Sequence, residues 1–376
     1  MKTENTVVKG TFWSAALFYF LIGFEFLYMA GPFAAYLYSV YAPALNYFND
    51  SPTLSWLNSF FLPHLVEETS STFINILGVT GIILAVGGFL AFCIGAGQVY
   101  YNKLRKKGVV TGGIYNYVRH PQYASFIICS LGMLILWPRF IVAIMFVTML
   151  FFYYLLAKVE EKECTAKFGQ SYLDYKNRTN MFFPFSLKPL SKLCLPQAGK
   201  MKVFVLVSAY FFALAAILGL AKGLQTLSIN SLYTVYTNNS VDLAVCKMSE
   251  EKIKEVMRIV RTDGNAAAIL SEFDNNTQFI NYILPVEWFV PEIPMNDEAG
   301  GGHRSPDNYD QNKAKVIIVK ASPRKKDAAA TANMFTNVHT TKGITEIWVD
   351  LSGQRVSRIL DMPEHVRFEG VPVAFY

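Results

Sequence analysis

Long apolar runs constrain this chain more than any other feature of its sequence. A helix needs about 20 residues to cross the hydrocarbon core of a bilayer. The sequence therefore predicts a mainly α-helical, polytopic membrane bundle of about five transmembrane helices. The runs expected to form them are residues 11–30, 73–96, 123–137, 140–157 and 203–221.

Composition and charge divide the chain into two environments. Of the 376 residues, 52% are hydrophobic and 16% are charged, whereas soluble domains contain about 25% charged residues, and the mean hydropathy is +0.27. Residues 1–221 hold 17 Lys and Arg against 9 Asp and Glu, and residues 222–376 hold 17 against 19. We therefore expect a basic membrane domain at 1–221 and an extramembrane domain at 223–376.

The positions of the basic residues predict the topology. They flank apolar runs rather than cluster on a polar face, so no nucleic-acid partner is expected. Four of them, at 103 and 105–107, follow the second run, and residues 158–202 carry nine basic against four acidic residues. The positive-inside rule places both loops in the cytosol and the domain at 223–376 on the opposite side of the membrane.

The first two runs carry further signals. Gly31 and Pro32 are expected to end the first run, which has no clear cleavage site after it and is interpreted as an anchored helix rather than a removed signal peptide. Glu25 should face the bundle rather than lipid. Small residues let membrane helices approach closely, and the second run contains Gly78, Gly81, Gly87, Gly88 and Gly95.

The third and fourth runs are separated only by Pro138 and Arg139. Proline interrupts a helix, and so short a gap permits only a tight turn. We therefore expect an antiparallel helical hairpin that enters and leaves the membrane on the cytosolic side. The hairpin would bring residues near 120 and 160 to the same membrane face.

The domain at 223–376 is expected to be of the α+β class. Its pattern predicts a helix near 249–273 and strands near 315–321, 346–351 and 355–360, with a hairpin turn at 352–354. It contains no nucleophile elbow and no phosphate loop, so its sequence assigns it no activity. The five cysteines of the chain form no disulfide framework and no zinc-ligand spacing, and no metal site is expected.

Polar and ionisable residues gather at the open end of the predicted hairpin. Residues 113–123 read G-I-Y-N-Y-V-R-H-P-Q-Y, Glu160 and Glu161 follow the second arm, and residues 168–178 read F-G-Q-S-Y-L-D-Y-K-N-R. Pro121 suits the first position of a helix, whose free N–H groups attract an anion. Glu160 could accept hydrogen bonds from an ammonium or ribose hydroxyl, while tyrosine rings offer faces to a cation. This set suits a zwitterion that carries a sulfonium.

These motifs resemble the membrane-embedded S-adenosylmethionine-dependent methyltransferases, which include isoprenylcysteine carboxyl methyltransferase and the phospholipid N-methyltransferases. The resemblance covers residues 109–185 and extends in hydrophobic pattern back to about residue 73. It consists of G-x-Y-x-x-x-R-H-P-x-Y, a hairpin, a glutamate pair, F-G-x-x-Y-x-x-Y-x-x-R and a closing proline at Pro184. One short motif would be weak evidence for the resemblance, but several motifs in the same order and at matching spacing are specific to it.

The resemblance implies S-adenosylmethionine as cofactor and a membrane lipid or a lipidated or lipophilic acceptor as substrate. It implies cofactor contacts at eight positions, namely Val109, Val110, Tyr115, His120, Pro121, Gln122, Tyr123 and Glu160. Transfer would be in line, and orientation and desolvation would supply most of the catalysis. Where an acceptor must lose a proton, His120 or Glu161 is the expected catalytic residue.

One position departs from the family pattern. Isoprenylcysteine enzymes have an arginine, implicated at the substrate carboxylate, four residues before the matching glutamate, and here that position is Leu156. The alternative function is therefore a non-catalytic membrane subunit that keeps the fold and binds a partner protein through residues 223–376.

Several polar residues also have structural interpretations. His120 with Pro121 could be a helix cap, and the glutamate pair a solvated interface. Tyr172, Tyr175 and Arg178 could anchor the loop at lipid headgroups or cover the cofactor. Arg119 could pair with lipid phosphate or with ligand.

Overall fold

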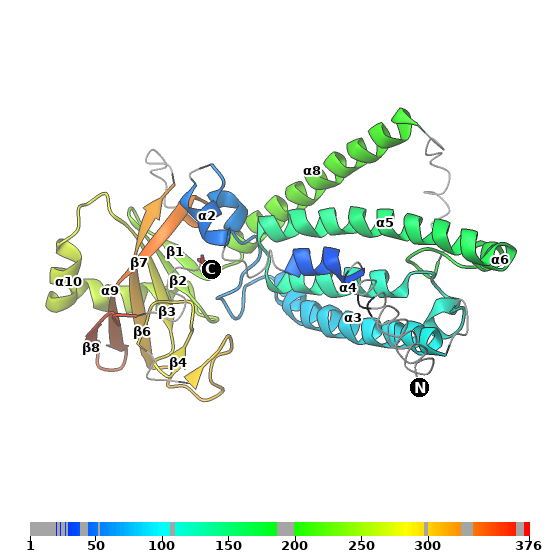
Figure 1. Cartoon of the computed structure of the whole chain (residues 1–376). Helices are drawn as coiled ribbons and strands as arrows, with labels where there is room; N and C mark the ends of the chain where they lie inside the picture. The colour runs from blue at the N-terminus through cyan, green and yellow to red at the C-terminus, as the bar shows by residue number, and fades with distance from the viewer. Residues whose placement is uncertain are drawn as a thin grey trace, which may run out of the picture. The chain divides into compact units, whose positions relative to one another are not determined.

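The structure is a computed structural model, shown in Figure 1, and it comprises two compact units. The helical unit consists of Met1–Tyr41, Gly81–Leu134 and Val142–Ile217, and the sheet unit of Ala42–Thr80, Ile135–Ile141 and Leu218–Tyr376. The residues described are 20, 23, 27, 29–37, 44–51, 53–105, 110–185, 199–296, 300–324, 334–365 and 372–376.

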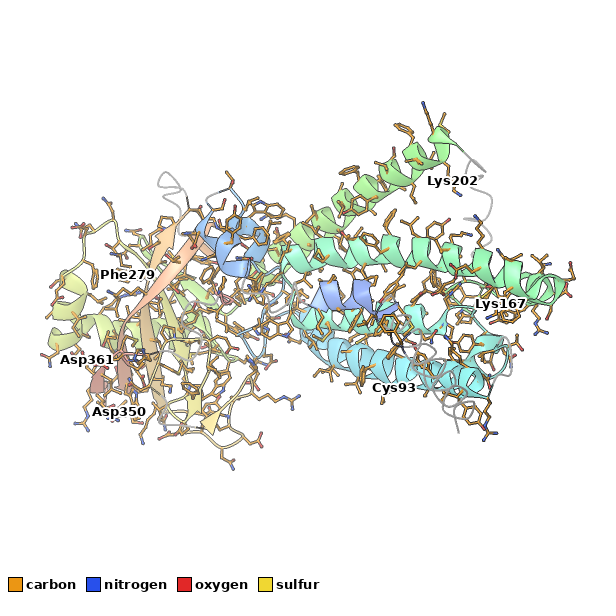
Figure 2. The ribbon with its side chains drawn as sticks, viewed as in Figure 1. Cys93, Lys167, Lys202, Phe279, Asp350 and Asp361 are labelled. Carbon is orange, nitrogen blue, oxygen red and sulfur yellow. The ribbon has the colours of Figure 1, made fainter. Side chains whose placement is uncertain are left out.

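Three of the described helices are long and apolar enough to cross a membrane. They are α3 (Thr72–Leu104), α5 (Phe140–Phe168) and α8 (Lys200–Asn230), and the shorter apolar helix α4 (Pro121–Leu136) accompanies them. Figure 2 shows side chains projecting from α3 on the stretch that contains Cys93, where Ile83, Phe89 and Ile94 are exposed. The prediction of a mainly helical chain is confirmed. The expected count of about five spans is not confirmed, because most of residues 11–30 lie outside the described part.

The expected end of the first helix at Gly31 and Pro32 is wrong, because residues 29–37 are helical across both. A proline inside a helix costs about 3 kcal/mol, and tertiary contacts offset that cost here. The Phe33 ring stacks on Phe126 with centroids 4.4 Å apart, and the Tyr36 hydroxyl donates to the carbonyl of Ser130 at 2.7 Å. Both partners belong to α4.

The predicted hairpin is present. Helix α4 ends at Leu136 and α5 begins at Phe140, and Figure 1 shows the two running side by side. The Ser130 hydroxyl lies 3.4 Å from the Met149 sulfur, and the Tyr123 and Tyr153 rings stack 4.7 Å apart. Ser130, which follows Tyr123 on α4, thus contacts Met149, which precedes Tyr153 on α5. This reversed order shows that the two helices pack antiparallel.

Helix α5 extends eleven residues beyond its expected end at 157, so the loop predicted from residue 158 is wrong in its first part. Glu160 and Glu161 are therefore helical residues with fixed directions. Glutamate and lysine are good helix formers, and the last turns of α5 are rich in both. Gly169, with φ of 56°, separates α5 from α6 (Gln170–Arg178).

Glycine permits close contact between α3 and α4 at defined points. A Cβ at Gly88 would lie 2.4 Å from the backbone nitrogen of Cys129, and one at Gly132 would lie 2.3 Å from that of Ala85. Gly87 has no described atom within 4 Å of the corresponding position, and neither does Gly78. The close-packing expectation thus holds for Gly88 but not for those two.

The sheet unit contains a six-stranded sheet in the order β1-β2-β3-β6-β7-β8. The β2–β3 pair is parallel, and the other neighbouring pairs are antiparallel. The strands are β1 (Thr234–Tyr236), β2 (Ser240–Ala244), β3 (Gln278–Leu284), β6 (Lys313–Pro323), β7 (Val338–Asp350) and β8 (Arg355–Asp361). A two-stranded parallel ribbon joins β4 (Trp288–Phe289) to β5 (Gly300–Gly301), and the short helix α11 (Met334–Asn337) precedes β7.

The three strands predicted from sequence correspond to β6, β7 and β8, and the hairpin expected at 352–354 joins the last two. The single helix expected at 249–273 is wrong, because two helices are present, α9 (Glu250–Thr262) and α10 (Gly264–Ser271). Asp263 separates them, since its carboxylate accepts from the backbone N–H groups of Asn265 and Ala266 and so caps α10. Strands β1 to β5 were not predicted.

Both faces of the sheet are covered. One face packs against α9 through Ile253, Val256 and Met257. The other face packs against residues that precede α3 in sequence, including Phe60 and Leu65. The helix α2 (Ala44–Asp50) and the 3-10 turn η1 (Ser55–Asn58) belong to the same segment. The core of the sheet unit therefore combines residues from distant parts of the chain.

Candidate cofactor-binding site

The first turn of α4 presents an anion-binding end. Pro121 occupies its first position, and the structure records no acidic residue in that turn. The preceding backbone is fixed, because the N–H groups of Arg119 and His120 donate to the carbonyls of Asn180 and Met181 at 2.9 and 3.1 Å. The N–H groups of the first turn have no acceptor within the helix. A positive helix end without a carboxylate cap favours an anionic ligand group.

Glu160 lies beside this helix end. Its carboxylate accepts a hydrogen bond from the Tyr123 hydroxyl, and its Oε2 lies 3.3 Å from His120 Nδ1. The side chain of Glu160 is 37% exposed, whereas that of His120 is 7% exposed. The hairpin therefore unites His120, Tyr123 and Glu160, and one side of the carboxylate stays open to a ligand.

Glu161 has the opposite environment. Its side chain is 2% exposed, with Oε1 2.8 Å from Arg119 Nε and Oε2 2.8 Å from Lys176 Nζ. His120 Nε2 lies 3.7 Å from the same carboxylate. Arg119 also donates to the backbone carbonyls of Lys176 and Thr179. Glu161 thus holds together α5, α6 and the stretch before α4, which is the geometry of a positioning residue.

The two glutamates control the charge of His120. Burial by itself would lower the pKa of the imidazole, but hydrogen bonding and charge interactions with Glu160 and Glu161 outweigh it, and the pKa is raised above its ordinary value of 6.5. His120 is therefore biased toward the imidazolium form. Its buried Nε2 faces the Glu161 carboxylate at 3.7 Å without a hydrogen bond of normal length.

The turn before α4 is built around Tyr115 and Gly113. Tyr115 is 5% exposed, its carbonyl accepts from the Tyr175 hydroxyl at 2.8 Å, and burial raises the pKa of its own hydroxyl. Gly113 has a φ of +63°, and a Cβ there would lie 2.3 Å from Nε2 of Gln98. Only glycine satisfies both conditions without strain.

The remaining predicted positions divide between described and undescribed residues. Val110 and Gln122 are partly buried and Pro121 is buried, and all three lie on the stretch that leads into or begins α4. Gln122 packs beside Gly95 of α3, where a Cβ would lie 3.5 Å from its Cγ. Val109 lies outside the described residues.

The structure also assigns partners to residues whose roles were open. Arg119 pairs with Glu161. Tyr172 and Tyr175 are 4% and 3% exposed, so they pack within the helical unit. Lys176, Thr179 and Gln98 were not predicted. Lys176 follows the motif tyrosine by one residue, which was the available signal, whereas the approach of Gln98 to Gly113 depends on how α3 packs.

Fold and site together define a helical membrane domain with an open polar site at the start of one hairpin arm. Residues 72–171 match the family model of the phospholipid methyltransferases. This stretch contains α3, the whole hairpin and the site residues named above up to Glu161, whereas Tyr172, Tyr175, Lys176, Thr179, Asn180 and Met181 lie beyond it.

Two curated relatives carry the same printed name, protein-S-isoprenylcysteine O-methyltransferase. The protein from Saccharomyces cerevisiae is 30% identical over 139 residues, which cover 34% of this chain and 58% of that protein. The protein from Schizosaccharomyces pombe is 36% identical over 77 residues, which cover 20% and 33%. No solved structure gives a significant match.

The helical domain is thus similar to isoprenylcysteine and phospholipid methyltransferases over this stretch. The chain spans 58% and 33% of the lengths of these two relatives. The matched stretches cover only part of this chain as well.

Proposed function

We propose that this protein is an integral membrane methyltransferase that transfers a methyl group from S-adenosylmethionine to a carboxylate of a lipophilic or lipidated acceptor. The observation that carries the proposal is the union of His120, Tyr123 and Glu160 at the start of α4. The printed names of the relatives, which specify O-methylation of isoprenylcysteine, support the acceptor class.

The charges of this site and its available hydrogen-bonding groups suit the cofactor. The backbone N–H groups of Gln122 and Tyr123, in the first turn of α4 that Pro121 begins, would donate to its carboxylate. The exposed side of Glu160 would accept from its ammonium or a ribose hydroxyl. Val109, Val110 and Tyr115 would complete the cofactor-binding set. When bound, S-adenosylmethionine supplies a methyl group that is already activated as part of a sulfonium.

Protonated His120 favours a carboxylate acceptor. A carboxylate needs no base for methylation, and the positive charge of an imidazolium attracts it. An amine acceptor would need a neutral base instead, and the raised pKa of His120 biases its imidazole away from the neutral form. In this proposal His120 is the catalytic residue at the acceptor. Glu161 assists by orienting His120 and Arg119 rather than by removing a proton.

The acceptor need not be identical to that of the relatives. Leu156 occupies the place of their arginine, and its apolar side chain is half-buried on α5. We propose that the acceptor enters from the lipid, that the site faces the cytosol, and that residues 223–376 lie on the opposite side, where they could bind a partner protein. A purely non-catalytic role is not favoured, since the similar proteins are enzymes and the polar set is intact.

Cofactor binding tests the site directly. Purified protein in nanodiscs is titrated with S-adenosylmethionine by calorimetry, and the Glu160→Gln variant is compared with Glu163→Gln, which alters an exposed glutamate of the same helix. Loss of a hydrogen bond to a charged group costs about 1.5–3 kcal/mol, so the affinity of Glu160→Gln should fall by about 10–100-fold. Glu163→Gln should bind like the parent.

Methyl transfer is then measured with labelled cofactor and N-acetyl-S-farnesylcysteine as the carboxylate acceptor. The expected product is a base-labile methyl ester, absent with His120→Ala. Failure of the parent protein to bind the cofactor at millimolar concentration would overturn the proposal. Binding without transfer to this acceptor or to a lipid carboxylate would overturn the acceptor class alone.

A further inference from the structure

Three side chains with metal-binding donors meet in the sheet unit. His64, Glu292 and His303 each offer one donor atom, and these atoms all lie within 4.8 Å of one another. His303 Nε2 lies 3.3 Å from Glu292 Oε1, and His64 Nε2 lies 4.0 Å from the same oxygen. In the described part of the chain, no other three such residues come this close.

These distances are near those of a metal site. Zinc binds imidazole nitrogen and carboxylate oxygen at about 2.0–2.2 Å, so neighbouring ligand atoms of a tetrahedral site lie about 3.3 Å apart. The Glu292–His303 pair already has this separation. The other pairs need a contraction of under about 1.5 Å, which side-chain rotation can supply.

Unused polar atoms point to a ligand. Nε2 of His64 and Oε2 of Glu292 are buried and have no hydrogen-bond partner among the described residues. Buried polar atoms are normally satisfied by a hydrogen bond or a bound ion. An ion between the three side chains would satisfy both atoms.

The surroundings of His64 match the outer shell of a metal-ligating histidine. Such a residue usually donates its second ring N–H to a carbonyl or carboxylate, and His64 hydrogen bonds to the backbone of Leu136. Its own backbone N–H donates to the carbonyl of Tyr376 at 2.9 Å, and the Trp137 ring lies 4.6 Å from its imidazole. Position and tautomer are thus fixed before any ion binds.

The other two side chains are held by the small β4–β5 ribbon. The Trp288 indole N–H donates to the carbonyl of Gly302 at 2.8 Å, and the Gly302 N–H donates to the carbonyl of Phe289 at 3.0 Å. Glu292 follows β4 and His303 follows β5, so pairing of the strands brings them together. Glu292 also lines a cavity of about 700 Å³, and His303 is about half exposed, which leaves the position accessible.

We propose that His64, Glu292 and His303 bind a divalent transition-metal ion, with zinc as the best-suited ion and water as a fourth ligand. Two imidazoles, one carboxylate and an open position form a common zinc arrangement. The bound ion would link the segment before α3 to the β4–β5 ribbon. Glu292 would be the only anionic ligand among the three.

The test uses the full-length protein purified in detergent, treated with chelator and dialysed. Zinc chloride is titrated by calorimetry, and metal content is measured after a second dialysis. The variants are His303→Ala, Glu292→Gln and His64→Ala, and His365→Ala is the matched control because it removes an exposed histidine of the same unit that is outside the cluster.

The parent and His365→Ala should each bind one zinc ion per chain. Loss of an outer-shell partner weakens metal binding by about 10–100-fold, and loss of one of three ligands should weaken it more than that. His303→Ala, at a half-exposed position, keeps the test valid if His64→Ala fails to fold. The proposal would be overturned if the parent bound no zinc, or if His303→Ala and Glu292→Gln bound zinc as tightly as the parent does. The cluster would then be only an ion pair. This zinc measurement does not depend on methyl transfer, so its outcome is independent of the proposed function.

Discussion

Adjacent glutamates on α5 have different surroundings because successive residues of a helix point in different directions. Glu160 is open on one side and bonded to Tyr123 and His120, whereas Glu161 is enclosed by cationic groups. The sequence predicted that both lie at the site but could not separate them. The difference depends on the continuation of α5 past residue 157 and on the position of α6, which supplies Lys176.

The enclosed carboxylate should matter for stability. Glu161→Gln leaves Arg119 and Lys176 near a neutral amide, and breaking a buried ion pair costs about 3–5 kcal/mol. The thermal midpoint of the purified protein should therefore fall clearly, as measured by intrinsic fluorescence in detergent. Glu163→Gln is the control and should leave the midpoint unchanged. Equal midpoints for the two variants would contradict the role of Glu161.

The raised pKa of His120 predicts a pH dependence of definite sign. A group whose folded-state pKa is raised contributes fully below its unfolded pKa of about 6.5, and the contribution is lost as pH rises through the folded value. The thermal midpoint without ligand should therefore decline above about pH 6.5 more steeply in the parent than in His120→Gln. His365→Gln should retain the parental slope, and identical slopes for the parent and His120→Gln would refute the assignment.

At the scale of elements, the packing of α3 on α4 depends on which glycine faces the neighbour. Gly88→Ala would place a methyl group against the backbone of Cys129, and overpacking of this kind costs about 1–3 kcal/mol. Gly87→Ala is the matched control, since it faces no described atom within 4 Å and should be neutral or stabilising by up to about 1 kcal/mol. Thermal midpoints of both variants measure the difference, and a reversed order would show that the helices pack through another face.

Elements with a clear local signal were predictable, and elements defined by tertiary structure were not. Pro138 marked the hairpin turn, and the turn at 352–354 marked the junction of β7 and β8. Strand β3 was missed because both of its faces are buried: apart from Gln278 and Asn281 its residues are apolar on both faces, and without alternation such a run does not distinguish strand from helix. The site showed the same division, since its motif residues were predicted and the packing partner Gln98 was not.

At the scale of the whole molecule, the sheet unit needs residues that precede α3. Phe60, Leu65 and Val66 belong to its hydrophobic core. The N–H of Glu67 donates to the carbonyl of Val245 at 2.9 Å, and the Gln225 amide donates to that of Phe60 at the same distance. A boundary drawn in sequence near residue 223 does not coincide with this core.

Expression of residues 223–376 alone should therefore give a less stable protein. Without residues 53–71, one face of the sheet exposes apolar surface, which promotes association. We expect aggregation by size-exclusion chromatography, and improved recovery when residues 53–71 are supplied through a flexible linker. A monomeric 223–376 fragment with the same thermal stability as the linked form would contradict this dependence.

The buried Arg139 has a consequence for the evolutionary record of the family. The residue is 2% exposed, and its guanidinium lies 4.7 Å from the centre of the Phe60 ring and donates to the carbonyl of Pro372 at 2.6 Å. A charge enclosed without such partners is strongly unfavourable. Homologues that share the C-terminal sheet should therefore inherit a basic residue at this position together with an aromatic one at 60. In homologues without that sheet, neither the basic residue nor the aromatic residue should be retained at these two positions.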